Sequence, residues 1–217
     1  MNDFIETKGI ILRSSNLKEY DKRLQILTSD RGKITVFANG VRRPNSKFLA
    51  ACSPFSFGEI RIFPGKNAYT LLDFSVKDYF EELRRDFEAS CMGMYFLEVA
   101  DYYCVENGDE LKFLKLLYAA LKNLEKIVKK EKEMRLGLAR IAFEIKAIEV
   151  NGEFPGVPSQ LTLSPAAVSA LNFFRDEAPE GVFSFKASEQ VEEELERAAC
   201  IYRQDFLKGD FKSLQLL

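Results

Sequence analysis

Basic side chains gather between residues 33 and 66, where six Lys or Arg are accompanied by a single acidic residue, Glu59. The centre of this stretch, residues 39–47, reads Asn-Gly-Val-Arg-Arg-Pro-Asn-Ser-Lys and combines turn-forming residues with three cations. Lys and Arg side chains neutralise phosphates and release their counterions, which makes binding salt-dependent and largely independent of base sequence. The stretch therefore predicts a mobile basic loop that contacts phosphate.

Phe37 is predicted to lie beside these cations on the outer face of a strand. Residues 33–39 alternate, and with Ile34 and Val36 on the buried face, Phe37 shares the opposite face with Lys33. An exposed aromatic ring next to cations suits stacking on a nucleobase, although a ring covered by a loop is the commoner arrangement. The candidate nucleic-acid contacts are Arg23, Arg31, Lys33, Phe37, Arg42, Arg43, Lys47, Arg61, Lys66 and Tyr69.

The formal net charge of −2 conceals an uneven distribution. Residues 1–80 hold 13 Lys or Arg against eight Asp or Glu, whereas residues 81–217 carry an excess of seven acidic residues. A basic front portion joined to an acidic remainder indicates that one surface meets a polyanion. Chance variation in composition is the alternative.

The residue types exclude most catalytic chemistry. The chain contains no His, which removes Ser-His-Asp and Cys-His nucleophile systems and all His-containing metal sites. Glu98 and Asp101 are too few for a Mg²⁺ site, so a buried pair with satisfied charges is the better interpretation. Gly65-Lys66-Asn67 lacks the spacing and the Ser or Thr of a phosphate-binding loop. We expect no enzymatic activity, no metal and no cofactor.

Cysteine usage and hydropathy bear on the compartment. The four cysteines are scattered without a CxxC pair: Cys52, Cys91, Cys104 and Cys200. The sequence opens without a basic and apolar leader, and no uncharged apolar run reaches the length of a membrane span. These features predict a reduced cytoplasmic protein without membrane association.

The first 78 residues predict a small β-barrel. Five strands are expected at residues 4–13, 20–28, 33–39, 55–63 and 68–76. Gly9 is expected to form a bulge or bend, residues 29–32 a hairpin turn, and Leu72 is placed on one face with Phe74 and Val76. Five short strands without intervening helices favour a five-stranded OB-type barrel.

Beyond residue 78 the apolar spacing becomes helical. Helices are expected at residues 87–106, from 109 to about 130, at 131–150, from Ser164-Pro165 onward, and after Ser188. The last helix carries several acidic residues that are interpreted as a solvated face: Glu192, Glu193, Glu194 and Glu196. The expected architecture is α+β, with an OB-fold barrel domain at residues 1–78 and an all-α helical domain at residues 79–217.

A second cluster of cations flanks the start of the third expected helix. Next to apolar side chains it could form a groove for an acidic peptide tail that ends in an apolar residue. The alternative is that these cations complement the dipole of the preceding helix. The candidate residues are Lys129, Lys130, Lys132, Arg135, Leu136, Arg140 and Phe143.

Several of these segments resemble the RecO family of bacterial recombination mediators. The similarity begins with a G-I-I-L-R opening at residues 9–13, an E-Y-D-K segment at 19–22, a T-x-x-x-G turn at 28–32, a G-x-R-R loop at 40–43 and P-F at 54–55. It continues with F-E-I-K-A-I-E-V-N-G-E-F-P at residues 143–155 and the closing F-K-S-L-Q-L-L at residues 211–217. It extends along nearly the whole chain in the same order.

This resemblance implies an OB-fold with a helical domain and no catalysis. The family binds single- and double-stranded DNA, anneals complementary strands, works with RecR, binds the acidic carboxy-terminal tail of single-stranded-DNA-binding protein, and helps RecA at gaps. It also implies a cytoplasmic protein that joins the nucleoid during repair. The alternative is a protein–protein adaptor whose basic barrel recognises an acidic peptide without nucleic acid.

One departure from the family lies in the loop after residue 155. Many members carry four cysteines there that resemble a structural zinc site, whereas this chain has Gly-Val-Pro-Ser-Gln-Leu at residues 156–161 and no cysteine before Cys200. We therefore expect no zinc, and a loop held by prolines and packing.

Overall fold

The computed structural model describes residues 4–217. Backbone contacts divide the chain into two compact units, one formed by the residues up to Glu81 together with Ala100–Leu114, and the other by Glu82–Val99 together with Lys115–Leu217. A barrel followed by helices confirms the expected α+β class. The predicted domain boundary at residue 78 stays a prediction, because it concerns whether each part of the chain folds on its own.

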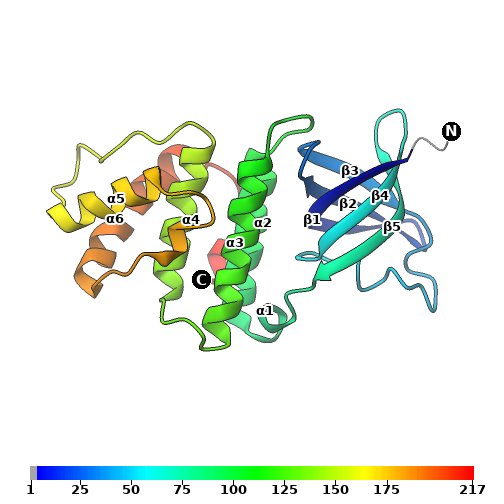
Figure 1. Ribbon diagram of the computed structural model, residues 1–217, viewed down its shortest axis with the longest axis horizontal. Helices are drawn as coiled ribbons and strands as arrows, with labels where there is room; N and C mark the ends of the chain where they lie inside the picture. The colour runs from blue at the N-terminus through cyan, green and yellow to red at the C-terminus, as the bar shows by residue number, and fades with distance from the viewer. Residues whose placement is uncertain (1–3) are drawn as a thin grey trace. The chain divides into compact units, whose positions relative to one another are not determined.

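Five strands close into the expected barrel in the order β1-β2-β3-β5-β4 (Figure 1). Their bounds are β1 (Ile5–Leu17), β2 (Asp21–Thr28), β3 (Lys33–Ala38), β4 (Phe57–Pro64) and β5 (Tyr69–Asp78). β3 and β5 pair in parallel, and the other neighbours pair antiparallel. Closure leaves the barrel without an open edge.

The alternation predicted for β3 is confirmed. Ile34, Val36 and Ala38 are buried in the barrel core, and their sequence neighbours are half-buried. The preceding turn at residues 29–32 also forms as expected, with Gly32 in the left-handed region at φ +63°.

Gly9 was expected to form a bulge or bend, and the bulge is wrong. The register of β1 against β2 shifts between Ile11 and Arg13, while Gly9 keeps regular pairing with Thr28. A Cβ at position 9 would lie 2.7 Å from the carbonyl oxygen of Leu27. Gly9 is therefore a position of close backbone approach, the other common reason for glycine in a strand.

The predicted face of Leu72 is also wrong. A register shift between Arg61 and Ile62 pairs Ile62 with Leu71 and Arg61 with Asp73, so that Leu72 is the extra residue of a β-bulge on β5. A bulge interrupts the period of two, so a side chain that alternation alone would bury is turned outward. Leu71 packs against the core instead.

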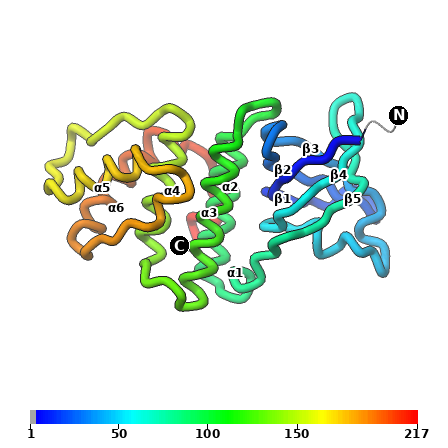
Figure 2. The backbone as a smooth tube through the Cα atoms, in the orientation of Figure 1, coloured from blue at the N-terminus to red at the C-terminus, as the bar shows by residue number. Residues whose placement is uncertain are grey.

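The helices, traced in Figure 2, follow the predicted order. They are α1 (Glu81–Arg85), α2 (Phe87–Tyr103), α3 (Leu111–Val128), α4 (Leu136–Val150), α5 (Pro165–Asp176) and α6 (Glu189–Phe206), with short 3₁₀ helices η1 (Val182–Ser184) and η2 (Ser213–Leu216). The predicted caps are confirmed, since the side chain of Ser164 accepts from the N–H of Ala167 and that of Ser188 from the N–H of Val191. Among the helices of residues 4–217, none combines the length and apolar character that a membrane span requires.

α4 begins five residues later than predicted. Lys130 adopts a left-handed conformation with φ 58°, which ends the preceding helical segment. The side chain of Lys132 then donates to the carbonyl oxygen of Phe183 and to the Oδ1 of Asn123. These contacts favour an irregular connection over a continuous helix.

The interpretation of the α6 glutamates as a solvated face is wrong for most of them. Glu194 is buried and accepts from the backbone N–H of Ser164 at 2.6 Å, while Glu192 pairs with Arg135. Of the four, Glu193 is the exposed one. Sequence alone did not show that α6 packs against α4 and α5, which is what buries this face.

Glu196 belongs to a closed ring of four charged side chains. Arg140 donates to Glu144 at 3.2 Å and to Glu196 at 2.7 Å, and Arg203 donates to Glu144 at 2.7 Å and to Glu196 at 2.8 Å. Tyr95 adds a hydrogen bond to Glu144 at 2.9 Å. Burial raises the pKa of Glu144, and the two guanidinium groups oppose that shift. The ring ties α4 to α6.

Candidate nucleic-acid interface

The loop between β3 and β4, residues 39–56, is anchored at its start to the turn between β1 and β2. The N–H of Gly40 donates to the Oδ1 of Asp21 at 2.7 Å, and the N–H of Arg42 donates to the carbonyl oxygen of Tyr20 at 2.9 Å. Gly40 has φ +65°, a conformation that glycine adopts without strain. Four residues from the β1–β2 turn and the loop start are thus fixed in one place.

The far end of this loop is anchored as well. The carbonyl oxygen of Cys52 accepts from the Oγ of Ser14 and from the Nζ of Lys22, each at 2.9 Å. The N–H of Phe55 donates to the carbonyl oxygen of Ile11 at 3.1 Å. Lys22 therefore stabilises the loop instead of facing a ligand.

Three exposed cations lie where the loop approaches the β1–β2 turn: Lys18, Arg42 and Arg43. The Nη1 of Arg42 lies 3.5 Å from the carbonyl oxygen of Lys18, and the guanidinium of Arg43 lies 5.8 Å from the ring centre of Tyr20. Within residues 4–217, none of the three forms an ion pair. This basic cluster is suited to phosphate oxygens, which would supply the missing negative charge.

Lys18 and Tyr20 are additions that sequence reasoning missed. They lie in a polar connection whose approach to the loop depends on tertiary hydrogen bonds. Tyr20 is exposed, and a hydrogen bond with Glu19 raises its pKa. The available signal was Tyr20 of the E-Y-D-K segment, an aromatic residue in a polar connection that follows Lys18 by two positions.

Phe37 and Arg23 lie directly opposite each other on β3 and β2. Arg23 is exposed, and Phe37 is half-buried on the outer face of the barrel. Two pairs further along, on the same face, the Oγ1 of Thr35 donates to the Oε1 of Gln25 at 3.2 Å. The structure therefore brings together an aromatic ring and a cation on the face predicted from alternation.

Two other predicted contacts are engaged elsewhere in the barrel unit. Lys33 pairs with Asp101 at 3.0 Å, and Arg13 pairs with the same carboxylate at 3.2 Å. Arg31 lies 3.7 Å from Asp30 in the β2–β3 turn. Asp101 is thus satisfied by cations of the barrel, while Glu98 accepts from Ser213, so the two acids do not pair with each other.

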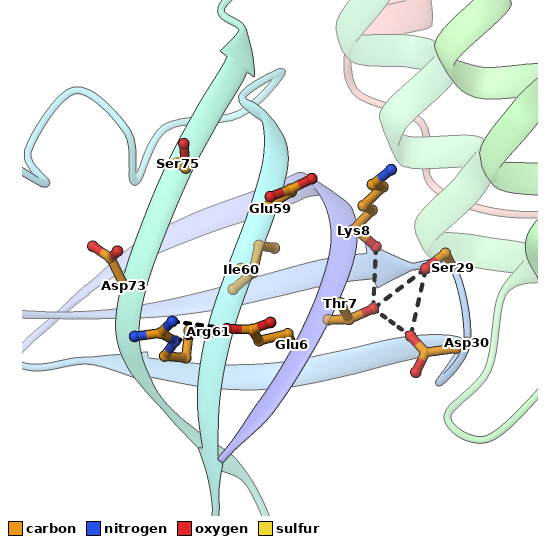
Figure 3. Close-up of a pocket in the computed structure, with 10 residues that line it drawn as sticks. All are labelled: Glu6, Thr7, Lys8, Ser29, Asp30, Glu59, Ile60, Arg61, Asp73 and Ser75. Atoms are coloured by element: carbon orange, nitrogen blue, oxygen red, sulfur yellow. Dashed lines mark hydrogen bonds and ion pairs between the residues drawn. The ribbon is translucent and has the colours of Figure 1, made fainter.

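Arg61 lines an acidic groove on the outside of the barrel, formed mainly by β1, β4 and β5. The basic cluster lies elsewhere, at the β1–β2 turn and the start of the β3–β4 loop. The groove has a volume of about 410 Å³, and its lining includes Glu6, Asp30, Glu59 and Asp73 (Figure 3). Arg61 pairs with Glu6 at 2.8 Å, and Lys47 pairs with Asp73 at 3.6 Å. Both cations are therefore at least partly neutralised by the protein.

The last two predicted contacts differ from each other. Lys66 is exposed in the β4–β5 turn, and among the described residues it has no ion-pair partner. Tyr69 pairs with the buried Val36 and packs against the barrel core, so its ring lies on the inner side of β5. Tyr69 is therefore less suited than Phe37 to stack on a base.

The barrel also matches a known family model. The model described as "Recombination protein O N terminal" matches residues 1–80. DNA repair protein RecO of Alkaliphilus metalliredigens is 31% identical over 169 residues, which cover 78% of this chain and 67% of that protein. The chain belongs to the RecO family.

The RecO relatives also align with the helical unit. DNA repair protein RecO of Acetivibrio thermocellus is 25% identical over 247 residues, covering 99% of this chain and 96% of that protein. The protein of the same name from Clostridium perfringens is 26% identical over 247 residues, covering 98% and 97%. The family resemblance seen in the sequence motifs is therefore confirmed.

In this RecO-family chain, the predicted groove around the start of α4 does not form as one surface. Phe143 is fully buried and stacks on Phe96 with 4.0 Å between the ring centres. Arg140 belongs to the charged ring, and Lys129 pairs with Glu125 at 3.8 Å. The sequence pattern could not predict this, because Phe143 contacts α2 and Arg140 contacts α6, and both contacts depend on how the helices pack.

A neighbouring pocket of about 470 Å³ combines three cations with apolar side chains. Its lining includes Lys132, Met134, Arg135, Leu138, Phe185 and Lys186, together with Glu133. Burial lowers the pKa of Lys132, and the positive charge of Lys126 adds to this shift. Lys132 and Arg135 were predicted, whereas Phe185 and Lys186 come from a segment that sequence reasoning left unassigned.

The loop at residues 151–164, for which the family resemblance implied cysteines that this chain lacks, is held by other contacts. The Oη of Tyr202 donates to the carbonyl oxygen of Gly156 at 2.7 Å, and its ring lies 5.7 Å from that of Phe154. Pro158 is buried, and Gly156 has φ +86°. The residues of this loop do not fit a zinc site, since none is a cysteine.

Proposed function

We propose that this RecO-family chain acts in DNA repair as a non-enzymatic mediator that binds single- and double-stranded DNA and anneals complementary strands. The observation that supports this most is the basic cluster of Lys18, Arg42 and Arg43. These cations are held on an anchored loop and turn, and no carboxylate of the described residues pairs with them. Phosphates of a nucleic acid are the natural counterions.

Annealing by such a surface requires no bond-breaking and no motor. Two complementary strands repel each other, and a basic surface that screens both lowers the repulsion when they meet. Arg23 and Phe37 extend the surface along β2 and β3, where a ring can stack on a base of a single strand. The interactions are mostly with the backbone, so we expect little dependence on base sequence.

We also propose that the pocket beside α4 binds the acidic carboxy-terminal tail of single-stranded-DNA-binding protein. Lys132, Arg135 and Lys186 make the pocket positive, and Glu192 offsets only the charge of Arg135, so the remaining cations complement acidic side chains. Met134 and Phe185 offer an apolar surface for a terminal hydrophobic residue. This moves the proposed tail site from the residues first predicted to a pocket that shares Lys132 and Arg135 with them.

Further partners follow from the family resemblance alone. RecR is the proposed direct partner, and RecA would benefit indirectly when single-stranded-DNA-binding protein is displaced at gaps. The same resemblance places the protein in the cytoplasm, on the nucleoid during repair.

The experiment that tests the proposal measures annealing of complementary oligonucleotides coated with single-stranded-DNA-binding protein, with and without that protein's acidic tail. Acceleration that requires the tail supports both the DNA surface and the pocket. Acceleration that is independent of the tail supports the DNA surface alone. No acceleration, combined with no oligonucleotide binding at low salt, would favour the adaptor that recognises an acidic peptide.

A further inference from the structure

Two large apolar side chains are exposed on the outer face of β4 and β5. Phe63 is 49% exposed and Leu72 is 46% exposed. Phe63 occupies an outward position of β4, two residues after Arg61, and Leu72 is turned outward by the β5 bulge. Exposed apolar side chains that lie together on one face mark a binding surface more often than isolated ones do.

The strand register places Phe63 in line with Phe37. Phe63 pairs with Thr70 across β4 and β5, and Thr70 pairs with Phe37 across β5 and β3. Directly paired residues lie on the same face of a sheet. The row continues through Arg23, which pairs with Phe37 on β2.

Two rings separated by one intervening strand have backbones roughly 10 Å apart, which is twice the usual strand spacing. That separation is short enough for a single strand to place bases on both rings. Thr70 between them is small, so it leaves the path across β5 open.

The charges around this row favour a nucleic acid as its occupant. Arg23 lies at one end of the row and Lys66 in the turn that follows β4, and neither has an ion-pair partner within residues 4–217. The nearest carboxylates on the neighbouring strand positions, Glu6 and Asp73, already pair with Arg61 and Lys47. The row is also continuous with the proposed DNA surface at Phe37.

We propose that Phe63 is a second base-stacking platform and that a single strand crosses the barrel along Arg23, Phe37, Thr70 and Phe63. This inference rests on the proposed DNA-binding function and deepens it by giving the single strand a path and a stacking residue. Stacking needs unpaired bases, whereas the basic cluster contacts the phosphates of any strand. Phe63 therefore contributes to binding of single strands and not of duplexes.

The first test compares Phe63→Ala with the wild-type protein, using a labelled oligothymidylate and a duplex of equal length. We expect single-strand affinity to fall by about tenfold or more, in line with one lost stacking interaction, and duplex affinity to stay unchanged. Phe87→Ala is the matched control, since Phe87 is 73% exposed on α2 and should leave both affinities unchanged.

The second test uses the absence of tryptophan from the chain. Phe63→Trp introduces a single fluorescent reporter, which oligothymidylate should quench and the duplex should not. Phe87→Trp should be quenched by neither.

Each outcome decides between the proposals. If wild-type protein binds single strands but Phe63→Ala binds them equally well, or loses duplex binding to the same extent, the stacking platform is wrong and the DNA-binding function stands. An unquenched Phe63→Trp at saturating oligothymidylate would also overturn the platform. If wild-type protein binds neither nucleic acid at low salt, the proposed function itself fails.

Discussion

Arg203 on α6 donates to the carboxylate of Glu144 on α4 at 2.7 Å, and Glu144 is completely buried. The bond is one side of the ring that also contains Arg140 and Glu196. A carboxylate that is buried in this way is stable only while its cationic partners are present. The relationship predicts where the helical unit is most sensitive to substitution.

Arg203→Ala should lower the free energy of unfolding by about 3–5 kcal/mol, because it leaves Glu144 with one of its two guanidinium partners. Urea denaturation followed by circular dichroism measures this. Arg197→Ala is the control, since Arg197 is exposed on the same helix, and it should change stability little. Equal stability of the two variants would show that the ring contributes nothing.

Replacing Arg42 and Arg43 together by Ala should weaken binding of single strands and duplexes of any sequence by about tenfold, since two phosphate contacts are lost. Arg61→Ala should leave binding near the wild-type value, because Glu6 already neutralises Arg61 at 2.8 Å. Fluorescence anisotropy at low salt measures both. A larger loss of affinity from Arg61→Ala than from the double variant would show that the basic cluster is not the main DNA-binding surface.

Tyr202→Phe should lower the free energy of unfolding by about 1 kcal/mol, because the carbonyl oxygen of Gly156 loses its donor. Limited proteolysis should cut the loop at residues 151–164 faster in this variant than in the wild-type protein. A metal chelator should change neither measurement for the wild-type chain. Destabilisation by the chelator would contradict a loop held by packing and hydrogen bonds.

Native thiol labelling should modify Cys200 and spare the other cysteines. Cys200 is exposed, whereas Cys52, Cys91 and Cys104 are buried. Burial raises the pKa of Cys52 to about 11, so at pH 8 only about one thousandth of that thiol is ionised. Mass spectrometry after iodoacetamide treatment identifies the labelled site, and rapid labelling of Cys52 would show that the loop at residues 39–56 opens readily.

The sequence was sufficient for the barrel, the helix order and the basic loop. Ile34, Val36 and Ala38 repeat every second residue, and local capping residues such as Ser164 and Ser188 determine where helices begin. These features depend on neighbours in the chain, which is why pattern reasoning finds them.

The partners of individual cations could not be predicted in the same way. Arg61 meets Glu6 and Lys33 meets Asp101 through contacts between residues that are far apart in the chain. Only the strand register and the return of residues 100–114 to the barrel reveal which charges are neutralised. The bulge that exposes Leu72 is a similar case, because one extra residue reverses the inferred face.

The central claim is that unpaired cations of the barrel bind nucleic-acid phosphates, and the salt dependence of oligonucleotide affinity tests it most directly. We predict a steep linear fall of log affinity with log salt for the wild-type protein. For the variant with Arg42→Ala and Arg43→Ala, the slope for single strands should be shallower by roughly 1.4, at about 0.7 for each lost phosphate contact. A flat salt dependence, or the same slope for both proteins, would contradict the claim.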